Sequence, residues 1–68
     1  MKNRLKIERA ILDITQEELA KIIGVSRQTI NSIEKNRYVP STELALKLSK
    51  VFDKTVNDFF ELDDKDKK

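Results

Sequence analysis

Apolar residues recur at spacings of three and four along this chain of 68 residues, and no stretch alternates apolar and polar residues over the length of a strand. Spacings of three and four place side chains on one face of a helix, whereas a strand with one buried face requires a period of two. The chain has one glycine and one proline, so its connections are expected to be short. The pattern predicts a single all-α domain.

Capping signals divide the chain into five helical segments. Candidate N-caps precede four of them: Thr15, Ser26, Ser41 and Thr55. Thr15 and Thr55 are each followed three residues later by an acidic residue, which is the pattern of a capping box. Gly24 suits the left-handed position at a helix end, and Pro40 blocks helix continuation. The expected helices cover residues 3–12, 16–23, 27–35, 42–52 and 56–61.

The apolar faces of these segments predict the core. In the first segment Leu5 and Leu12 share a face. In the segment 16–23 the expected apolar stripe contains Leu19, Ile22 and Ile23. The domain is expected to span residues 1–62, because the tail 63–68 contains no apolar residue and is expected to be disordered.

Cysteine and histidine are both absent from the sequence. Without cysteine the chain has no disulfide and no thiolate metal site, and without histidine it lacks the usual general base and the commonest metal ligand. The carboxylates are scattered, and the run Asp63, Asp64 and Asp66 is interpreted as part of a charged tail. We therefore expect no enzyme activity, no metal and no cofactor.

The N-terminal segment MKNRLKIERA carries charges at almost every second position. This pattern excludes the apolar core of a signal peptide, and no run approaches the roughly 18 apolar residues of a membrane span. A soluble, cytoplasmic protein with no membrane partner is expected.

Positive charge is concentrated in the N-terminal half of the chain. Residues 1–38 contain eight Lys or Arg and five Asp or Glu, a balance of +3, whereas residues 39–68 contain six and seven, a balance of −1. A basic surface attracts phosphates, so this mild bias favours nucleic acid as a partner.

The segment 27–35 has an unusual polar face. Ile30 and Ile33 lie about 60° apart on a helical wheel and define its buried side. The other positions include Gln, Asn, Ser and Arg, which can bond to base edges in a major groove. Any surface helix is polar outside, but ordinary ones are usually filled with Glu and Lys, which are better helix formers. The residue types favour a helix that reads DNA.

The spacing around the single glycine predicts how the segments 16–23 and 27–35 meet. Ala20 is small enough for close contact, Gly24 permits a sharp turn, and Val25 fills the corner. Ile30 and Ile33 then close the core behind the turn. Two helices that cross at about 90–120° through a tight turn require this arrangement.

The segment TQEELAKIIGVSRQTINSIEKNR resembles the helix-turn-helix of the phage Cro and repressor type, also called the XRE type. The resemblance extends from about Leu5 to Phe60. The segments VSRQTINSIEKNRYVPS and LALKLSKVF are similar to those of small stand-alone regulators, such as the repressor of a cytolysin operon. The resemblance implies a five-helix, lambda-repressor-like domain whose second and third helices form the helix-turn-helix.

The same resemblance implies roles for individual residues. Positions that reach base edges are matched by Arg27, Gln28 and Ser32, with Thr29 and Asn31 as further candidates. Positions that contact the DNA backbone are matched by Gln16, Ser26, Lys35, Asn36, Arg37 and Tyr38. Tyr38 is equally suited to packing under the loop that follows.

Arg9 and Glu34 match a pair that the family uses to join its first and third helices. The helical wheel agrees, because Glu34 falls about 40° from Ile30, beside the core. Such a pair would fix the angle of the third helix without necessarily adding net stability. The alternative is that both residues are ordinary surface charges.

Double-stranded DNA is the expected partner, and the expected role is that of a repressor. One helix contacts few bases, so a homodimer on a pseudo-palindrome is expected, with half-sites about 34 Å apart. Candidates for the dimer surface are Ile7, Ile11, Phe59, Phe60 and Leu62. We expect one of the two phenylalanines to point inward and the remaining residues to be shared across the dimer.

The alternative to a DNA regulator alone is an antitoxin, which pairs with a toxin as well as with its promoter. Segments that bind toxins usually add length, and only the short tail is present here.

Overall fold

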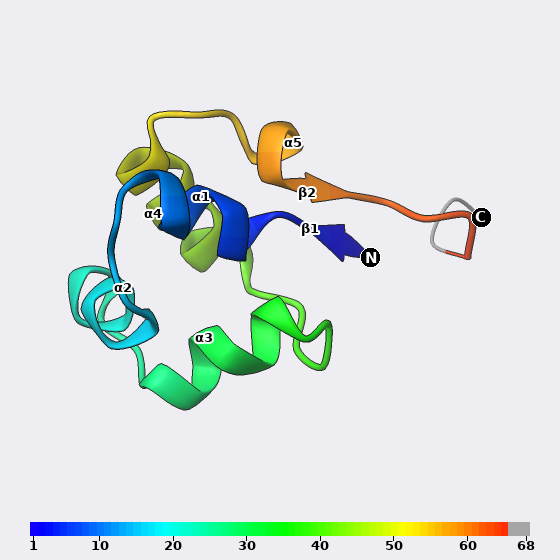
Figure 1. The fold of residues 1–68 in the computed structure, drawn as a ribbon. Helices are drawn as coiled ribbons and strands as arrows, with labels where there is room; N and C mark the ends of the chain where they lie inside the picture. The colour runs from blue at the N-terminus through cyan, green and yellow to red at the C-terminus, as the bar shows by residue number, and fades with distance from the viewer. Residues whose placement is uncertain (66–68) are drawn as a thin grey trace.

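Five helices account for most of the fold in the computed structural model, which describes residues 1–65. They are α1 (Leu5–Ile11), α2 (Gln16–Ile23), α3 (Arg27–Glu34), α4 (Thr42–Phe52) and α5 (Val56–Phe59). Two short strands, β1 (Lys2–Asn3) and β2 (Phe60–Glu61), complete the structure. Figure 1 shows α3 along the lower edge of the molecule, with α1 and α4 above it.

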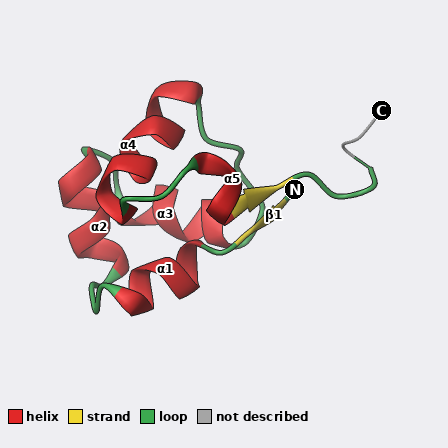
Figure 2. Ribbon diagram, turned by 90° about the horizontal axis from the view of Figure 1, so that it is seen from above, coloured by secondary structure: helices red, strands yellow, loops and turns green. Residues whose placement is uncertain are grey.

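A short strand pair adds to the predicted all-α fold, which is otherwise helical as expected. β1 and β2 are antiparallel, with Lys2 opposite Glu61 and Asn3 opposite Phe60. The backbone N–H of Arg4 also donates to the carbonyl of Phe59, at 2.8 Å. Strands of two residues are too short to produce an alternating pattern, so they could not be predicted from the sequence. They lie at the opposite end of the molecule from α2 in both views (Figures 1 and 2).

The strands also shorten two of the expected helices. The first helix begins at Leu5 rather than at residue 3, and the last ends at Phe59 rather than at residue 61. Phe60 has φ −122° and ψ 137°, which is an extended conformation. The bounds of α2 and α4 agree with the predicted ranges, and α3 ends one residue early, at Glu34.

Side-chain caps hold the predicted helix starts. The Thr15 side chain accepts from the backbone N–H of Glu18 while Glu18 accepts from the backbone of Thr15, so the capping box is complete. Ser26 and Ser41 each accept from the third residue of their helices, at 3.2 Å in both cases. Thr55 forms the second predicted capping box. Each cap satisfies an N–H that has no partner inside the helix.

The core lies between the five helices. Its buried residues are Leu5, Leu19, Ala20, Ile23, Ile30, Ile33, Leu44, Leu48, Phe52, Phe59 and Phe60. The rings of Phe52 and Phe59 meet edge to face, with centroids 5.2 Å apart. This contact joins α4 to α5, and α5 in turn holds the strand pair.

Two apolar residues expected in the core are exposed instead. Ile22 is 59% exposed, because it lies about 100° around α2 from Ile23 and falls outside the face that packs on α3 and α4. Leu12 is 43% exposed, because α1 ends at Ile11 and the chain turns away there. An acidic residue, Glu8, takes the buried place on α1 instead.

The turn between α2 and α3 consists of Gly24, Val25 and Ser26. Gly24 has φ 78° and ψ 35°, the left-handed conformation expected at the end of a helix. The N–H groups of Gly24 and Val25 both donate to the carbonyl of Ala20, at 2.8 and 2.9 Å. Ala20 is 2% exposed, so α2 and α3 meet closely at this point.

Candidate nucleic-acid interface

α3 has one buried face and one polar face. Ile30 and Ile33 are 0% and 1% exposed, so they fix the rotation of the helix about its axis. Arg27 and Gln28 are exposed at its N-terminal end, and the remaining polar positions of the first two turns are partly buried. The polar face is therefore presented outward as the sequence indicated.

A shallow depression of about 300 Å³ lies beside α3. It is lined by Ser26, Gln28, Thr29, Ser32, Arg37 and Tyr38. The fold thus brings together residues from both predicted groups, those matched to base contacts and those matched to backbone contacts. Arg27 lines a different depression, with Gln16 and the loop before α2. Lys35 and Asn36 are exposed and line neither.

Tyr38 lies between the polar face and the turn. It is 45% exposed and lines both the depression beside α3 and a second one formed with Gly24, Val25 and Leu44. Its position therefore fits both of the roles considered for it, a surface contact and packing beside the loop.

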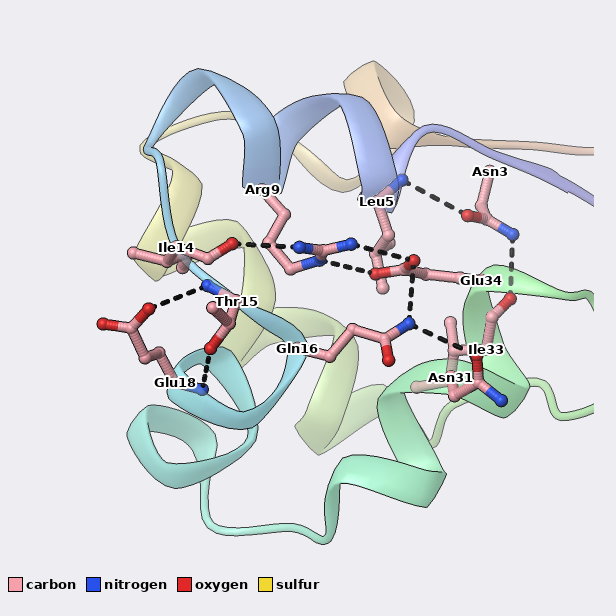
Figure 3. A network of polar contacts seen from close by, with 10 residues as sticks. All are labelled: Asn3, Leu5, Arg9, Ile14, Thr15, Gln16, Glu18, Asn31, Ile33 and Glu34. Atoms are coloured by element: carbon pink, nitrogen blue, oxygen red, sulfur yellow. Dashed lines mark hydrogen bonds and ion pairs between the residues drawn. The ribbon is translucent and has the colours of Figure 1, made fainter.

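A network of polar contacts connects α1, α2 and α3 (Figure 3). Arg9 Nε donates to Glu34 Oε2 at 2.9 Å, and Arg9 Nη2 donates to Glu34 Oε1 at 3.3 Å. Arg9 Nη1 donates to the carbonyl of Ile14 at 2.9 Å. The two charged side chains are 17% and 8% exposed. The ion pair expected between the first and third helices is therefore present, and it is largely buried.

Gln16 belongs to the same network. Its Nε2 donates to Glu34 Oε1 at 3.2 Å and to Asn31 Oδ1 at 3.3 Å (Figure 3). Both N–H groups of this amide are therefore used inside the protein, and the carbonyl oxygen of Asn31 is used as well. Asn31, a further candidate for a base contact, therefore bonds to another residue of the protein, because α2 and α3 approach closely enough to join these two amides.

Three side chains on α3 keep their hydrogen-bonding groups unused. Within residues 1–65, the side chains of Arg27, Gln28 and Ser32 make no hydrogen bond to another residue, whereas the Thr29 hydroxyl lies 3.0 Å from that of Ser26. These three are the residues first matched to base contacts.

Asn3 and the conformation of Asn36 were not foreseen as parts of this site. Asn3 Nδ2 donates to the carbonyl of Ile33 at 2.9 Å and to Asn36 Oδ1 at 2.8 Å, and its Oδ1 accepts from the N–H of Leu5 at 3.2 Å. Asn36 has φ 60° and lies just after α3. Asparagine tolerates the left-handed region, so its place after a helical segment could have indicated a helix end.

The candidates for the dimer surface separate into two groups. Ile7, Ile11 and Leu62 are 50%, 63% and 52% exposed. Phe59 and Phe60 are 1% and 8% exposed, so both rings point inward, whereas one of them was expected to be shared across the dimer. Both rings belong to the core cluster, against which Val56 of α5 also packs.

Three further expectations concern the charged tail, membrane helices and metal binding. Asp63 Oδ2 lies 3.3 Å from the N-terminal nitrogen of Met1, while residues 66–68 of the predicted tail, including Asp66, lie outside the described residues. None of the helices in residues 1–65 has the length and apolar character needed to cross a membrane. In the same range, no group of three acidic side chains is placed to hold a metal ion.

Comparison with known proteins gives matches over nearly the whole chain. A family model described as helix-turn-helix matches residues 5–59. A helix-turn-helix-type transcriptional regulator of Methanocaldococcus jannaschii is 53% identical over 64 residues, which are 94% of this chain and 97% of that protein. Regulators of the same description from Archaeoglobus fulgidus and Bacillus subtilis are 46% and 47% identical, each over more than nine-tenths of both chains.

Proposed function

The chain belongs to the helix-turn-helix family of DNA-binding transcriptional regulators, and we propose that it represses transcription as a homodimer on a pseudo-palindromic operator. In this proposal α2 and α3 form the helix-turn-helix, and α3 enters the major groove. One observation carries it. Arg27, Gln28 and Ser32 make no side-chain hydrogen bond within residues 1–65, whereas Thr29 and Asn31 on the same helix bond to Ser26 and Gln16.

Base reading is assigned to the outward side of α3. Glutamine bonds to adenine through two atoms, arginine bonds to guanine in the same way, and serine accepts several bases. The burial of Ile30 and Ile33 prevents the helix from rotating, so these side chains keep a constant direction. Thr29 and Asn31 are assigned supporting contacts, because their polar groups already bond to Ser26 and Gln16.

Backbone contacts are assigned to residues at the two ends of α3. Arg37, Tyr38 and Ser26 line the same depression as Gln28, and Lys35 and Asn36 are exposed beside it. Because both side-chain donors of Gln16 are engaged, we assign its phosphate contact to its backbone N–H at the start of α2. The cationic contacts from Lys35 and Arg37 would release counterions from the DNA and make the affinity depend steeply on the salt concentration.

The homodimer is placed on the apolar surface that follows α3. A depression of about 270 Å³ there is lined by Met1, Val39, Pro40, Thr42, Ala45, Leu46, Val56 and Phe60. Val39 and Leu46 are 67% and 59% exposed, and Leu62 just after β2 is 52% exposed. A two-fold axis at this end of α3 would set two such helices side by side on one face of DNA. Ile7 and Ile11 on α1 form the competing surface.

Selection from random duplex DNA tests this proposal. We expect the enriched sequences to contain an inverted repeat with half-sites one helical turn apart. Fluorescence anisotropy should then show binding to that site at least 1000-fold tighter than to a scrambled duplex of equal length, as is typical of specific regulators. Equal affinity for both duplexes would refute sequence-specific reading.

The direction of regulation needs a second assay. In a transcription assay with the selected site placed over a promoter, we expect added protein to lower the amount of transcript. A rise in transcript would identify an activator and would leave the DNA-binding assignment intact.

A further inference from the structure

The side chain of Asn3 joins three segments of the chain. Its two N–H groups reach the carbonyl of Ile33 and the side-chain oxygen of Asn36, at 2.9 and 2.8 Å. Its oxygen accepts the first N–H of α1, that of Leu5, at 3.2 Å (Figure 3). An asparagine amide has two donors and an acceptor, and here all three functions are used.

The contacts of Asn3 lie where the chain leaves α3. The carbonyl of Ile33 also accepts the N–H of Asn36 at 3.0 Å, and the N–H of Arg37 donates to the carbonyl of Ser32 at 2.8 Å. Asn36 has φ 60°, so the backbone leaves the helical path at that residue. The direction of this turn decides where Arg37 and Tyr38 point.

Asn3 is itself held firmly. It pairs with Phe60 in the strand pair, and the next residue, Arg4, donates its N–H to the carbonyl of Phe59. Phe59 and Phe60 are both buried in the core. Asn3 therefore connects the end of α3 to the buried residues Phe59 and Phe60.

We propose that Asn3 is a positioning residue for DNA binding, which fixes the exit of α3 and thereby aims the segment Lys35–Tyr38 at the DNA backbone. This inference rests on the proposed function. Asn3 acts separately from the Arg9–Glu34 pair. In that pair Arg9 bonds to the side chain of Glu34, whereas Asn3 bonds to the backbone carbonyl of Ile33, one residue earlier. The pair sets the tilt of the helix, and Asn3 sets the path of the chain beyond it.

The variant Asn3→Ala tests the proposal without changing the net charge. It should weaken binding to the selected site and to scrambled DNA by a similar factor of roughly ten, because the segment it releases carries phosphate contacts. The slope of log affinity against log salt should become shallower by about one unit. The preference for the selected site should stay within about threefold of that of the wild type, because Gln28 lies at the other end of α3.

Thr55→Ala is the matched control. It removes a side chain that bonds to Asp58 at the start of α5, as Asn3→Ala removes one that bonds to the N–H of Leu5 at the start of α1, but it lies away from α3. The control should lower thermal stability by a similar amount and leave the salt slope unchanged. If both variants gave the same salt slope as the wild type, Asn3 would have only a structural role and the proposal would be overturned.

Amide hydrogen exchange provides a test that needs no DNA. In Asn3→Ala the N–H groups of Asn36 and Arg37 should exchange at least tenfold faster, while those of α2 change no more than they do in Thr55→Ala. Unchanged exchange at Asn36 and Arg37 would overturn the positioning role, whatever the DNA measurements give. Failure of the wild type to prefer any sequence would instead count against the proposed function.

Discussion

Gln28 and Arg37 face the same depression beside α3, but their side chains should act differently on DNA. Gln28→Ala should cost about 1–3 kcal/mol at the operator and relax the base preference at one position. Arg37→Ala should weaken all sequences about equally and make the salt slope shallower by about one unit. Anisotropy titrations of operator, single-base variants and scrambled duplex at several salt concentrations measure both effects. Equal loss of specificity in the two variants would show that the roles are misassigned.

The Arg9–Glu34 pair predicts a large effect on stability from one side chain. Glu34→Ala would leave the guanidinium of Arg9, which is 17% exposed, without its carboxylate. Loss of one partner of a buried pair costs about 3–5 kcal/mol, whereas a chain of this size has about 3–10 kcal/mol in total. Urea unfolding should therefore show a much lower midpoint.

Glu43→Ala is the control for that measurement. Glu43 pairs with Lys47 at 3.6 Å, but the two side chains are 80% and 50% exposed. An exposed pair of this spacing contributes at most about 0.5 kcal/mol, so the midpoint should hardly move. Similar losses in Glu34→Ala and Glu43→Ala would show that burial of the Arg9 pair has no energetic consequence.

Residue contacts within the helical pattern could be predicted from the sequence, and contacts outside it could not. The position of Glu34 beside Ile30 on the helical wheel was enough to place it near the core. Asn3 gave no comparable signal, because its role depends on a strand of two residues whose partner is more than fifty residues away. The hydrogen bond between Gln16 and Asn31 was also missed. It depends on how closely α2 and α3 pack, which the sequence pattern does not specify, so Gln16 was assigned only to a DNA contact.

Among the elements, the turn between α2 and α3 depends on the conformation of a single residue. Gly24 has φ 78°, and a Cβ added there would meet no atom within 4 Å. Gly24→Ala should therefore cost only the strain of the left-handed backbone, about 1–2 kcal/mol. Circular dichroism should show a melting temperature lower by roughly 4–8 °C for each kcal/mol.

Asparagine tests the cause of that loss. Gly24→Asn adds a larger side chain at the same position but tolerates positive φ better than alanine. It should lose clearly less stability than Gly24→Ala. A greater loss in the asparagine variant would mean that space, rather than backbone conformation, limits the turn.

Helices with strong caps were predicted to within a residue, and the ends of the chain were not. α2 and α4 begin after Thr15 and Ser41, whose side chains cap them as expected. The error in the last helix arose because Phe60 is apolar and continues the helical spacing, although pairing with Asn3 holds it extended. Buried Glu8 was also missed, since its place depends on Lys54, whose Nζ lies 2.9 Å from its carboxylate.

On the scale of the whole molecule, ion pairs and hydrogen bonds between distant segments supplement a small core. A chain of this length buries only about 60% of its unfolded surface, so its margin of stability is thin. The Arg9–Glu34 pair, the Glu8–Lys54 pair and Asn3 each bridge segments far apart in the sequence. Two of the three contact α3 or its exit. The contacts that supplement the core thus also fix the polar face relative to the rest of the domain.

Assembly is the property of the whole molecule that the sequence constrained least. The sequence offered five apolar dimer candidates, and the fold buries two of them, Phe59 and Phe60. The other three, Ile7, Ile11 and Leu62, stay exposed, and the fold exposes a further apolar surface around Val39 and Leu46. Single lysine substitutions can distinguish this surface from that on α1, because Leu46 and Ile11 are 59% and 63% exposed and neither is needed for the core.

Leu46→Lys should convert the proposed dimer to a monomer in sedimentation velocity at micromolar concentration, whereas Ile11→Lys should not. A lysine in an apolar contact must be desolvated without a partner, which opposes association. The added positive charge favours DNA, so weaker operator binding by Leu46→Lys would have to come from the lost dimer rather than from repulsion. The opposite result would move the interface to α1. A wild type that sediments as a monomer would refute the homodimer, since each chain would then bind its half-site alone.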